Sequence, residues 1–145
     1  MSVLLKKGIT GFSAIRDFCP DENDYKKFRK ICYSLQNVIN MKIINTVNPD
    51  CTSYFCAEFT DNENKIYFLL NKYYNVGGFT KNLIFGDKIF TDCSNIYLNE
   101  CEIIPAVILN SDFRETNHDL SKCELEQINY WKPVSVGNII FNEWD

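Results

Sequence analysis

Apolar residues recur at helical spacing in the segment after Pro20, and basic residues occupy many of the remaining positions. Two acidic residues, Asp21 and Asp24, frame the start of this segment, where a carboxylate can cap a helix and interacts favourably with its dipole. The pattern predicts an amphipathic helix. Its expected buried positions are Tyr25, Phe28, Ile31 or Cys32, and Leu35.

From Met41 to Phe90 the hydrophobic period changes to two, and β-branched and aromatic residues become frequent, which indicates β-strands. Turn-forming clusters at 48–50 and 61–64 divide the first part into two consecutive hairpins. One face of these strands is expected to pack on helices. The second face keeps tyrosines and is either partly covered or available for binding. The expected strands are Met41 to Val47, Ser53 to Thr60 and Lys65 to Asn71.

A further hairpin is expected around Gly86-Asp87, with Leu83 to Phe85 on one side and Lys88 to Phe90 on the other. The next apolar run, Ile103 to Leu109, fits a strand and a short helix equally well, and the sequence leaves this choice open.

Helical signals return in the last part of the chain. Ser121 and Glu124 have the spacing of a capping box, and Pro133 ends the helix that follows. Ser135 is expected to cap a last helix from Val136 to Trp144. The helix that begins after Ser121 has an apolar stripe formed by Cys123, Ile128 and Trp131. This stripe predicts that Trp131 lies in the core. For Trp144 two roles stay open, a buried staple and an exposed interface anchor.

These elements define an α+β fold, in which a mainly antiparallel sheet packs against one N-terminal and two C-terminal helices. A length of 145 residues with 46% hydrophobic content fits a single domain over residues 1–145. No apolar run approaches the roughly 20 residues of a membrane span, and no secretory signal is recognisable. Seven irregularly spaced cysteines fit reduced, mostly buried thiols. We therefore expect a cytoplasmic protein.

Charge is distributed unevenly along the chain. Residues 1–50 carry a balance of +3 and residues 51–145 a balance of -7, of which -6 falls within residues 100–145. Such an acidic segment repels nucleic acid and attracts a basic protein partner, unless it is only a solvated face.

No pattern typical of a catalytic, cofactor or metal site is present. The single histidine, His118, lies in a polar stretch without an adjacent nucleophile, and Gly77-Gly78 lacks the following residues of a phosphate-binding loop. Asp112, Glu115 and Asp119 lie close together, but they lack the residue pattern of a calcium loop. The sequence therefore predicts no catalytic residue, no cofactor and no metal.

Several aromatic residues stand among polar ones near expected loops or element ends, where each is either an exposed interface anchor or part of the edge of the core. They are Tyr73, Tyr74, Tyr97, Tyr130, Trp131 and Trp144.

Two terminal stretches resemble those of small cytosolic bacterial proteins, some of which are similar to immunity proteins of toxin–immunity systems. The first is the run from Lys6 to Phe12, and the second has the spacing Trp131, Pro133, Gly137, Phe141, Trp144 and Asp145. The resemblance implies a protein that is not an enzyme and that binds and neutralises a cognate toxin.

The expected function is therefore to occlude the active site of a basic toxin, such as a nuclease, through an acidic surface with aromatic anchors. The alternative is a module that binds a small molecule or peptide on its aromatic sheet face. No nucleic acid and no membrane is expected as a partner. The expected partner-binding residues are Asp112, Glu115, Asp119, Glu124, Glu126, Glu143, Trp144, Asp145, Tyr73 and Tyr74.

Overall fold

In the computed structural model the chain is described over residues 4–12, 24–83, 87–93, 96 and 98–144. Its helices are α1 (Tyr25–Ile39), α2 (Ala106–Leu109), the 3-10 turn η1 (Phe113–Glu115), α3 (Lys122–Trp131) and α4 (Val136–Ile140). Its strands are β1 (Lys42–Val47), β2 (Tyr54–Thr60), β3 (Lys65–Asn71), β4 (Val76–Thr80), β5 (Phe90–Thr91) and β6 (Glu102–Ile103). The three strands expected in the first part of the sheet are confirmed to within one residue.

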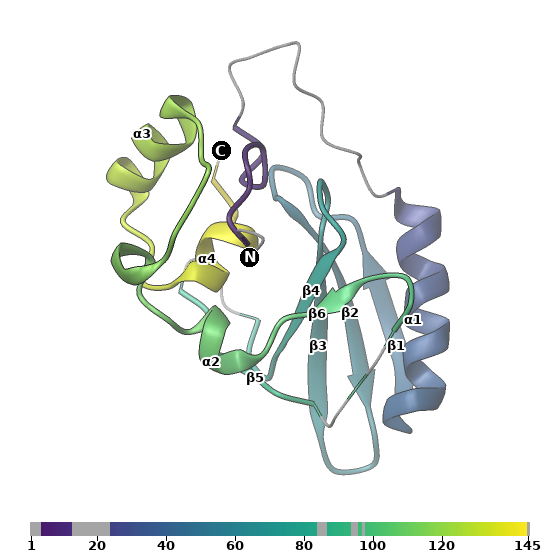
Figure 1. Ribbon diagram of the computed structural model, residues 1–145. Coiled ribbons are helices and arrows are strands. Elements are labelled where there is room, and N and C mark those ends of the chain that lie inside the picture. The colour runs from purple at the N-terminus through teal and green to yellow at the C-terminus, as the bar shows by residue number, and fades with distance from the viewer. Residues whose placement is uncertain (1–3, 13–23, 84–86, 94–95, 97, 145) are drawn as a thin grey trace.

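The strands form one sheet in the order β1-β2-β3-β4-β5, with antiparallel neighbours throughout. Strand β6 runs parallel to β4 and pairs with its first two residues, whereas β5 pairs with its last two. Helix α1 covers one face, and α2 and α4 lie on the other side of the sheet (Figure 1). This arrangement confirms the expected α+β fold with a mainly antiparallel sheet.

Helix α1 forms as its periodicity predicts. The Asp24 carboxylate accepts a hydrogen bond from the backbone N–H of Lys27 at 2.6 Å and so caps the helix. The helix ends at Asn40, which adopts the left-handed conformation with φ 56°. Its buried residues pack on the aromatic face of the sheet, with the rings of Phe28 and Phe68 stacked at 5.9 Å. Asp21 lies outside the described residues.

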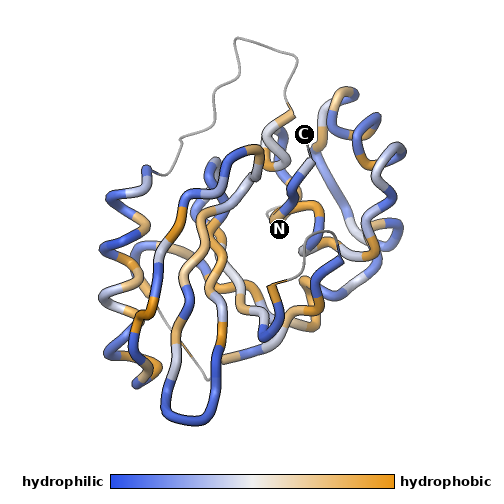
Figure 2. Tube along the Cα trace, turned by 180° about the vertical axis from the view of Figure 1, so that it is seen from behind, coloured by the Kyte–Doolittle hydropathy of each residue, from blue (hydrophilic) through white to orange (hydrophobic). Residues whose placement is uncertain are grey.

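The sheet separates two hydrophobic cores, because successive side chains of a strand point to opposite faces. Phe55, Ala57 and Phe59 of β2 pack beneath α1. Tyr54 and Cys56, which alternate with them along the strand, pack in the other core with α4. The second face is therefore covered at Tyr54, whose ring lies edge-on to Phe141 at 6.4 Å. In Figure 2 hydrophobic residues recur along the strands of the sheet, whereas the turn between β2 and β3 is hydrophilic.

The run from Ile103 to Leu109 contains both of the alternatives that the sequence left open. Ile103 ends β6, where Ile104 N–H donates to the Gly77 carbonyl at 2.8 Å, and Ala106 then begins α2. Pro105 separates the two elements and occupies the N-cap position of the helix, without a side-chain hydrogen bond to it. The hairpin expected around Gly86-Asp87 involves residues 84–86, which lie outside the described residues.

The capping box of α3 is confirmed, since Ser121 and Glu124 exchange hydrogen bonds between side chain and backbone. The placement of Trp131 in the core was wrong, because its side chain is 41% exposed at the end of the helix and only Ile128 of the predicted stripe is fully packed. The last helix is also shorter than expected. It ends at Ile140 because Phe141 leaves the helical region at φ -117° and ψ 81°.

Burial differs among the cysteines that the structure describes, and Cys19 lies outside the described residues. Cys32, Cys56 and Cys101 are buried, Cys93 and Cys123 are half-buried, and Cys51 is exposed. Burial raises the pKa of the Cys56 and Cys101 thiols to about 12, so these thiols are neutral at physiological pH. Among the described residues no helix is long and apolar enough to span a membrane.

Candidate functional site

Five of the acidic residues expected at the interface lie on the segment from Asp112 to Glu126, which contains η1 and the first half of α3. Glu115, Asp119 and Glu126 are exposed. Asp112 is bound to Arg114, whose guanidinium donates at 2.7 Å and holds the pKa of that carboxyl below its usual value. Its charge is therefore largely offset by its neighbour.

The prediction that Glu124 is an interface residue is wrong, because Glu124 is 0% exposed. Its carboxylate accepts hydrogen bonds from the backbone N–H groups of Gly8 and Thr10 at 2.9 and 3.0 Å. It also accepts from the Ser121 N–H at 3.0 Å. A carboxylate that is fully occupied in this way has a structural role.

The interface role of Glu143 and Trp144 is also contradicted by the structure. Glu143 forms an ion pair with the fully buried Lys88 and accepts a hydrogen bond from the Tyr54 hydroxyl at 2.8 Å. Trp144 is 9% exposed, and the centre of its ring system lies 6.2 Å from that of the Phe12 ring. Of the two roles that the sequence left open, Trp144 therefore has the buried one. Asp145 lies outside the described residues.

The fold also brings basic residues to the acidic segment, which the linear charge count missed. Leu5 forms a parallel bridge with His118, and its carbonyl accepts from the Asp119 N–H at 2.9 Å. Lys6 and Lys7 follow directly on this bridged segment. Within the segment from Asp112 to Glu126, the exposed carboxylates are those of Glu115, Asp119 and Glu126.

An exposed aromatic pair lies at the end of α3. Tyr130 is 75% exposed, and its ring meets that of Trp131 edge-on at 5.2 Å. The indole N–H of Trp131 donates to Gln127 at 3.1 Å, which holds the ring against the helix. Glu126 precedes Tyr130 by four residues, so both lie on the same side of the helix. We call Glu126, Tyr130, Trp131 and the exposed Val134 the α3 surface.

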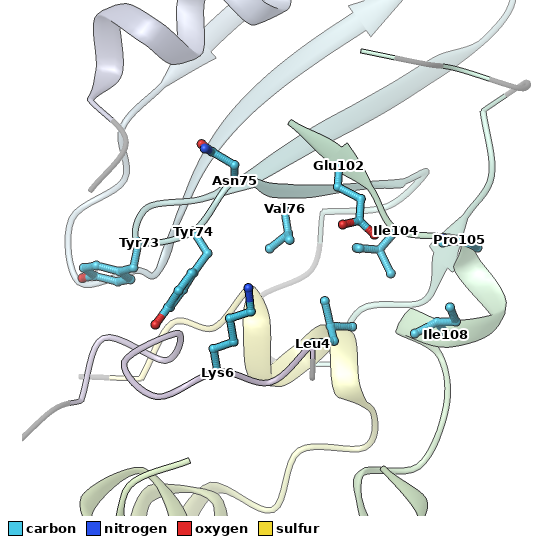
Figure 3. A pocket seen from close by; sticks show the side chains of 10 residues that line it. All are labelled: Leu4, Lys6, Tyr73, Tyr74, Asn75, Val76, Glu102, Ile104, Pro105 and Ile108. Atoms are coloured by element: carbon cyan, nitrogen blue, oxygen red, sulfur yellow. The ribbon is translucent and has the colours of Figure 1, made fainter. Parts of the chain in front are cut away.

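Tyr73 and Tyr74, also expected at an interface, are half-buried and line a pocket of about 480 Å³ at the edge of the sheet (Figure 3). The pocket lies between the N-terminal segment, the turn after β3, strand β6 and helix α2. We call it the tyrosine pocket. It is lined by Leu4, Lys6, Tyr73, Tyr74, Asn75, Val76, Glu102, Ile104, Pro105 and Ile108.

Tyr74 joins the turn to the N-terminal segment. Its hydroxyl donates to the Lys7 carbonyl at 2.5 Å, and burial raises its pKa above the usual value. The ammonium group of Lys6 lies 5.7 Å from the centre of the Tyr74 ring, within cation–π range. The pocket is thus at the edge of the sheet, whereas the alternative function expected its binding surface on the sheet face, where Tyr54 is buried.

His118 is exposed beside Phe113, and its Nδ1 accepts a hydrogen bond from the Leu120 N–H at 3.2 Å. Within the described part of the chain, no three His, Cys, Asp or Glu residues are grouped as metal ligands would be. Neither observation supplies a catalytic group to the α3 surface or to the tyrosine pocket.

Comparison of the chain with protein-family models, with curated proteins and with solved structures found no match.

Proposed function

We propose that this chain is a non-enzymatic protein-binding module of the immunity type, which neutralises a cognate bacterial toxin by covering its active site. The α3 surface is the proposed centre of contact. The single observation that carries the proposal is the exposed pair of Tyr130 and Trp131 at the end of α3.

Large aromatic side chains are costly to leave in water, and Tyr and Trp dominate the binding energy of protein interfaces. Trp131 is held in place by Gln127, and Tyr130 by its contact with Trp131. Little conformational freedom would be lost when a partner covers the pair, which favours binding.

The exposed carboxylates supply the proposed selectivity. Glu126 lies on the α3 surface, and Glu115 and Asp119 lie on the segment that leads into α3. Carboxylates around aromatic anchors attract a basic partner and increase its association rate more than they increase the affinity. A nuclease, whose active site is basic because it binds phosphates, is the class of toxin that fits this chemistry.

The test uses the product of the gene that neighbours the gene of this chain. We expect its expression to arrest growth, co-expression of the chain to restore growth, and the purified proteins to bind. Tyr130→Ala with Trp131→Ala is expected to weaken binding roughly 30-fold or more, the effect of losing about 2 kcal/mol at an interface centre.

Tyr33→Ala is the matched control, because Tyr33 is an exposed tyrosine of α1, distant in sequence from the α3 surface. It should bind as the unchanged chain does. A neighbouring product that is harmless and does not bind, or equal binding by the double variant, would overturn the proposal. Indifference of the association rate to salt between 50 and 500 mM would remove its electrostatic part.

A further inference from the structure

The tyrosine pocket is separate from the α3 surface and is formed by four segments that are distant in sequence (Figure 3). Its volume of about 480 Å³ lies in the range of small-molecule sites, roughly 300–1,000 Å³. The inference below concerns this pocket and does not depend on the proposed toxin binding.

The walls of the pocket are held by hydrogen bonds to backbone groups before any ligand arrives. The Asn71 side-chain oxygen accepts from the N–H groups of Tyr73 and Tyr74 at 2.8 and 2.9 Å, which fixes the turn. On the opposite wall, Glu102 N–H donates to the Asn75 carbonyl at 2.9 Å. A preformed site of this kind binds its ligand with little ordering cost.

The middle of the pocket is apolar. Val76 and Leu4 are half-buried and Ile104 is buried, and Figure 3 shows Val76 between the two charged side chains, with Leu4 and Ile104 beside it. Ile108 of α2 extends this surface towards solvent. An aliphatic or aromatic group of a ligand would lose contact with water here, which favours binding.

Two opposite charges face each other across this apolar middle. The Lys6 ammonium group and the Glu102 carboxylate point into the pocket from different sides (Figure 3). Among the described residues no ion pair joins them. A second ammonium group, that of Lys27, is bound to the Asn75 side chain at 2.7 Å at the rim.

We propose that the tyrosine pocket binds a small zwitterion with an apolar centre, of the size of a dipeptide. Its carboxylate would pair with Lys6 and its ammonium group with Glu102, while its side chains cover Val76 and Ile104. Lys6 is directed towards the pocket by its contact with the Tyr74 ring. Each exposed ion pair contributes modestly, so selectivity comes from the presence of both charges on one ligand.

The test is a titration of the ¹⁵N-labelled chain with leucyl-leucine, followed by NMR. We expect shifts of the amides of Val76, Glu102 and Ile104. N-acetyl-leucyl-leucine, which lacks the ammonium group, and leucyl-leucine amide, which lacks the carboxylate, should each bind about threefold to fivefold more weakly, the effect of one exposed ion pair.

Variants assign each charge to its partner. Glu102→Gln should weaken binding of leucyl-leucine about threefold to fivefold and leave binding of the N-acetyl form unchanged. Lys6→Met should weaken binding of leucyl-leucine to a similar extent and leave binding of leucyl-leucine amide unchanged. Glu100→Gln and Lys81→Met, at exposed positions outside the pocket, are the matched controls. If Lys6→Met fails to fold, the amidated dipeptide on the unchanged chain tests the same contact.

The absence of shifts at the pocket would overturn the inference, and so would equal binding of all three dipeptides. Trp131→Ala should leave the titration unchanged. The two proposals are thereby distinguished, because loss of toxin binding with intact dipeptide binding contradicts only the first.

Discussion

Thr10 and Glu124, which are 114 residues apart in the chain, are joined by two hydrogen bonds in the interior. The Glu124 carboxylate accepts from the Thr10 backbone N–H at 3.0 Å and from its hydroxyl at 2.5 Å. The other carboxylate oxygen accepts hydrogen bonds from the backbone N–H groups of Gly8 and Ser121. One side chain thus caps α3 and holds the N-terminal turn against it. This turn adjoins Lys6 and the tyrosine pocket.

Glu124→Gln should therefore destabilise the fold, because a glutamine amide replaces one acceptor oxygen with a donor facing backbone N–H groups. We expect a loss of about 2–4 kcal/mol in the free energy of unfolding, measured by urea denaturation. The amides of Gly8 and Thr10 should exchange faster with solvent. Glu126→Gln, on the exposed side of the same helix, should change stability by less than about 0.5 kcal/mol. Equal stabilities of the two variants would contradict the structural role of Glu124.

Substitution of Trp144 and of Trp131 should change the stability of the protein by different amounts, and the two residues should differ in their fluorescence emission. Trp144→Ala removes a buried ring and is expected to cost about 3–4 kcal/mol, whereas Trp131→Ala should cost less than about 1 kcal/mol. Emission from Trp144 in the Trp131→Ala variant should be blue-shifted relative to that from Trp131 in the Trp144→Phe variant, because only Trp144 is shielded from water. Identical emission maxima would contradict this placement.

Removal of residues 142–145 should be more damaging than loss of Trp144 alone. Truncation after Phe141 deletes Glu143 and leaves Lys88 buried without its carboxylate partner. It also deletes the Asn142 amide, which donates to the Thr10 carbonyl at 3.1 Å. Because a broken buried ion pair costs about 3–5 kcal/mol, we expect the truncated chain to be largely unfolded by circular dichroism. A cooperative melting transition close to that of the full chain would show that the last residues do not close the fold.

Gly137→Ala should destabilise the protein although alanine is the better helix former. A Cβ atom at this position would lie 2.3 Å from the Phe90 ring, in a buried part of the core. The clash is expected to cost about 2–3 kcal/mol, since the Cβ atom would approach three atoms of the buried Phe90 ring, and this exceeds the roughly 1 kcal/mol gained in helix propensity. Thermal denaturation checks this, with Asn129→Ala in the exposed part of α3 as the control. An increase in melting temperature for Gly137→Ala would refute the close contact.

Alkaline pH should destabilise the fold through its buried thiols. The pKa of Cys56 and Cys101 is raised to about 12 from the ordinary value of 9.0, so the folded chain holds protons that the unfolded chain releases. The contribution of these thiols to the free energy of unfolding is complete below pH 9. It is lost as the pH rises from 9 towards 12, by up to about 1.4 kcal/mol per pH unit for each thiol.

Lys88 acts in the opposite direction, because burial lowers its pKa below 10.5 and the unfolded chain then binds the additional proton. We expect the thiols to dominate, so that the free energy of unfolding in urea falls between pH 9 and 10.5. The Cys56→Ala, Cys101→Ala double variant should be less stable at pH 7 but show a weaker decline. A stability that is constant or rises over this pH interval would contradict the prediction.

Much of the fold follows from local patterns. Helix α1 and strands β1 to β3 were predicted because period, caps and turn residues act within a few positions of one another. The capping box of Ser121 and Glu124 was recognised for the same reason. The candidate sites were harder to predict from the sequence. Tyr73 and Tyr74 were expected at an interface, but the pocket that they line was not predicted. Tyr130 was one of several aromatic residues whose exposure the sequence could not rank.

The sequence by itself determined that this chain forms an α+β fold with an amphipathic helix, a mainly antiparallel sheet and further helices at its end. Only the tertiary structure decided which acids are exposed, which tryptophan is buried, and that Lys6 and Glu102 line the same pocket. The physical reason is distance along the chain. Hydrophobic period and helix caps are set by neighbouring residues, whereas the burial of Glu124 and Trp144 depends on partners that folding brings from the opposite end.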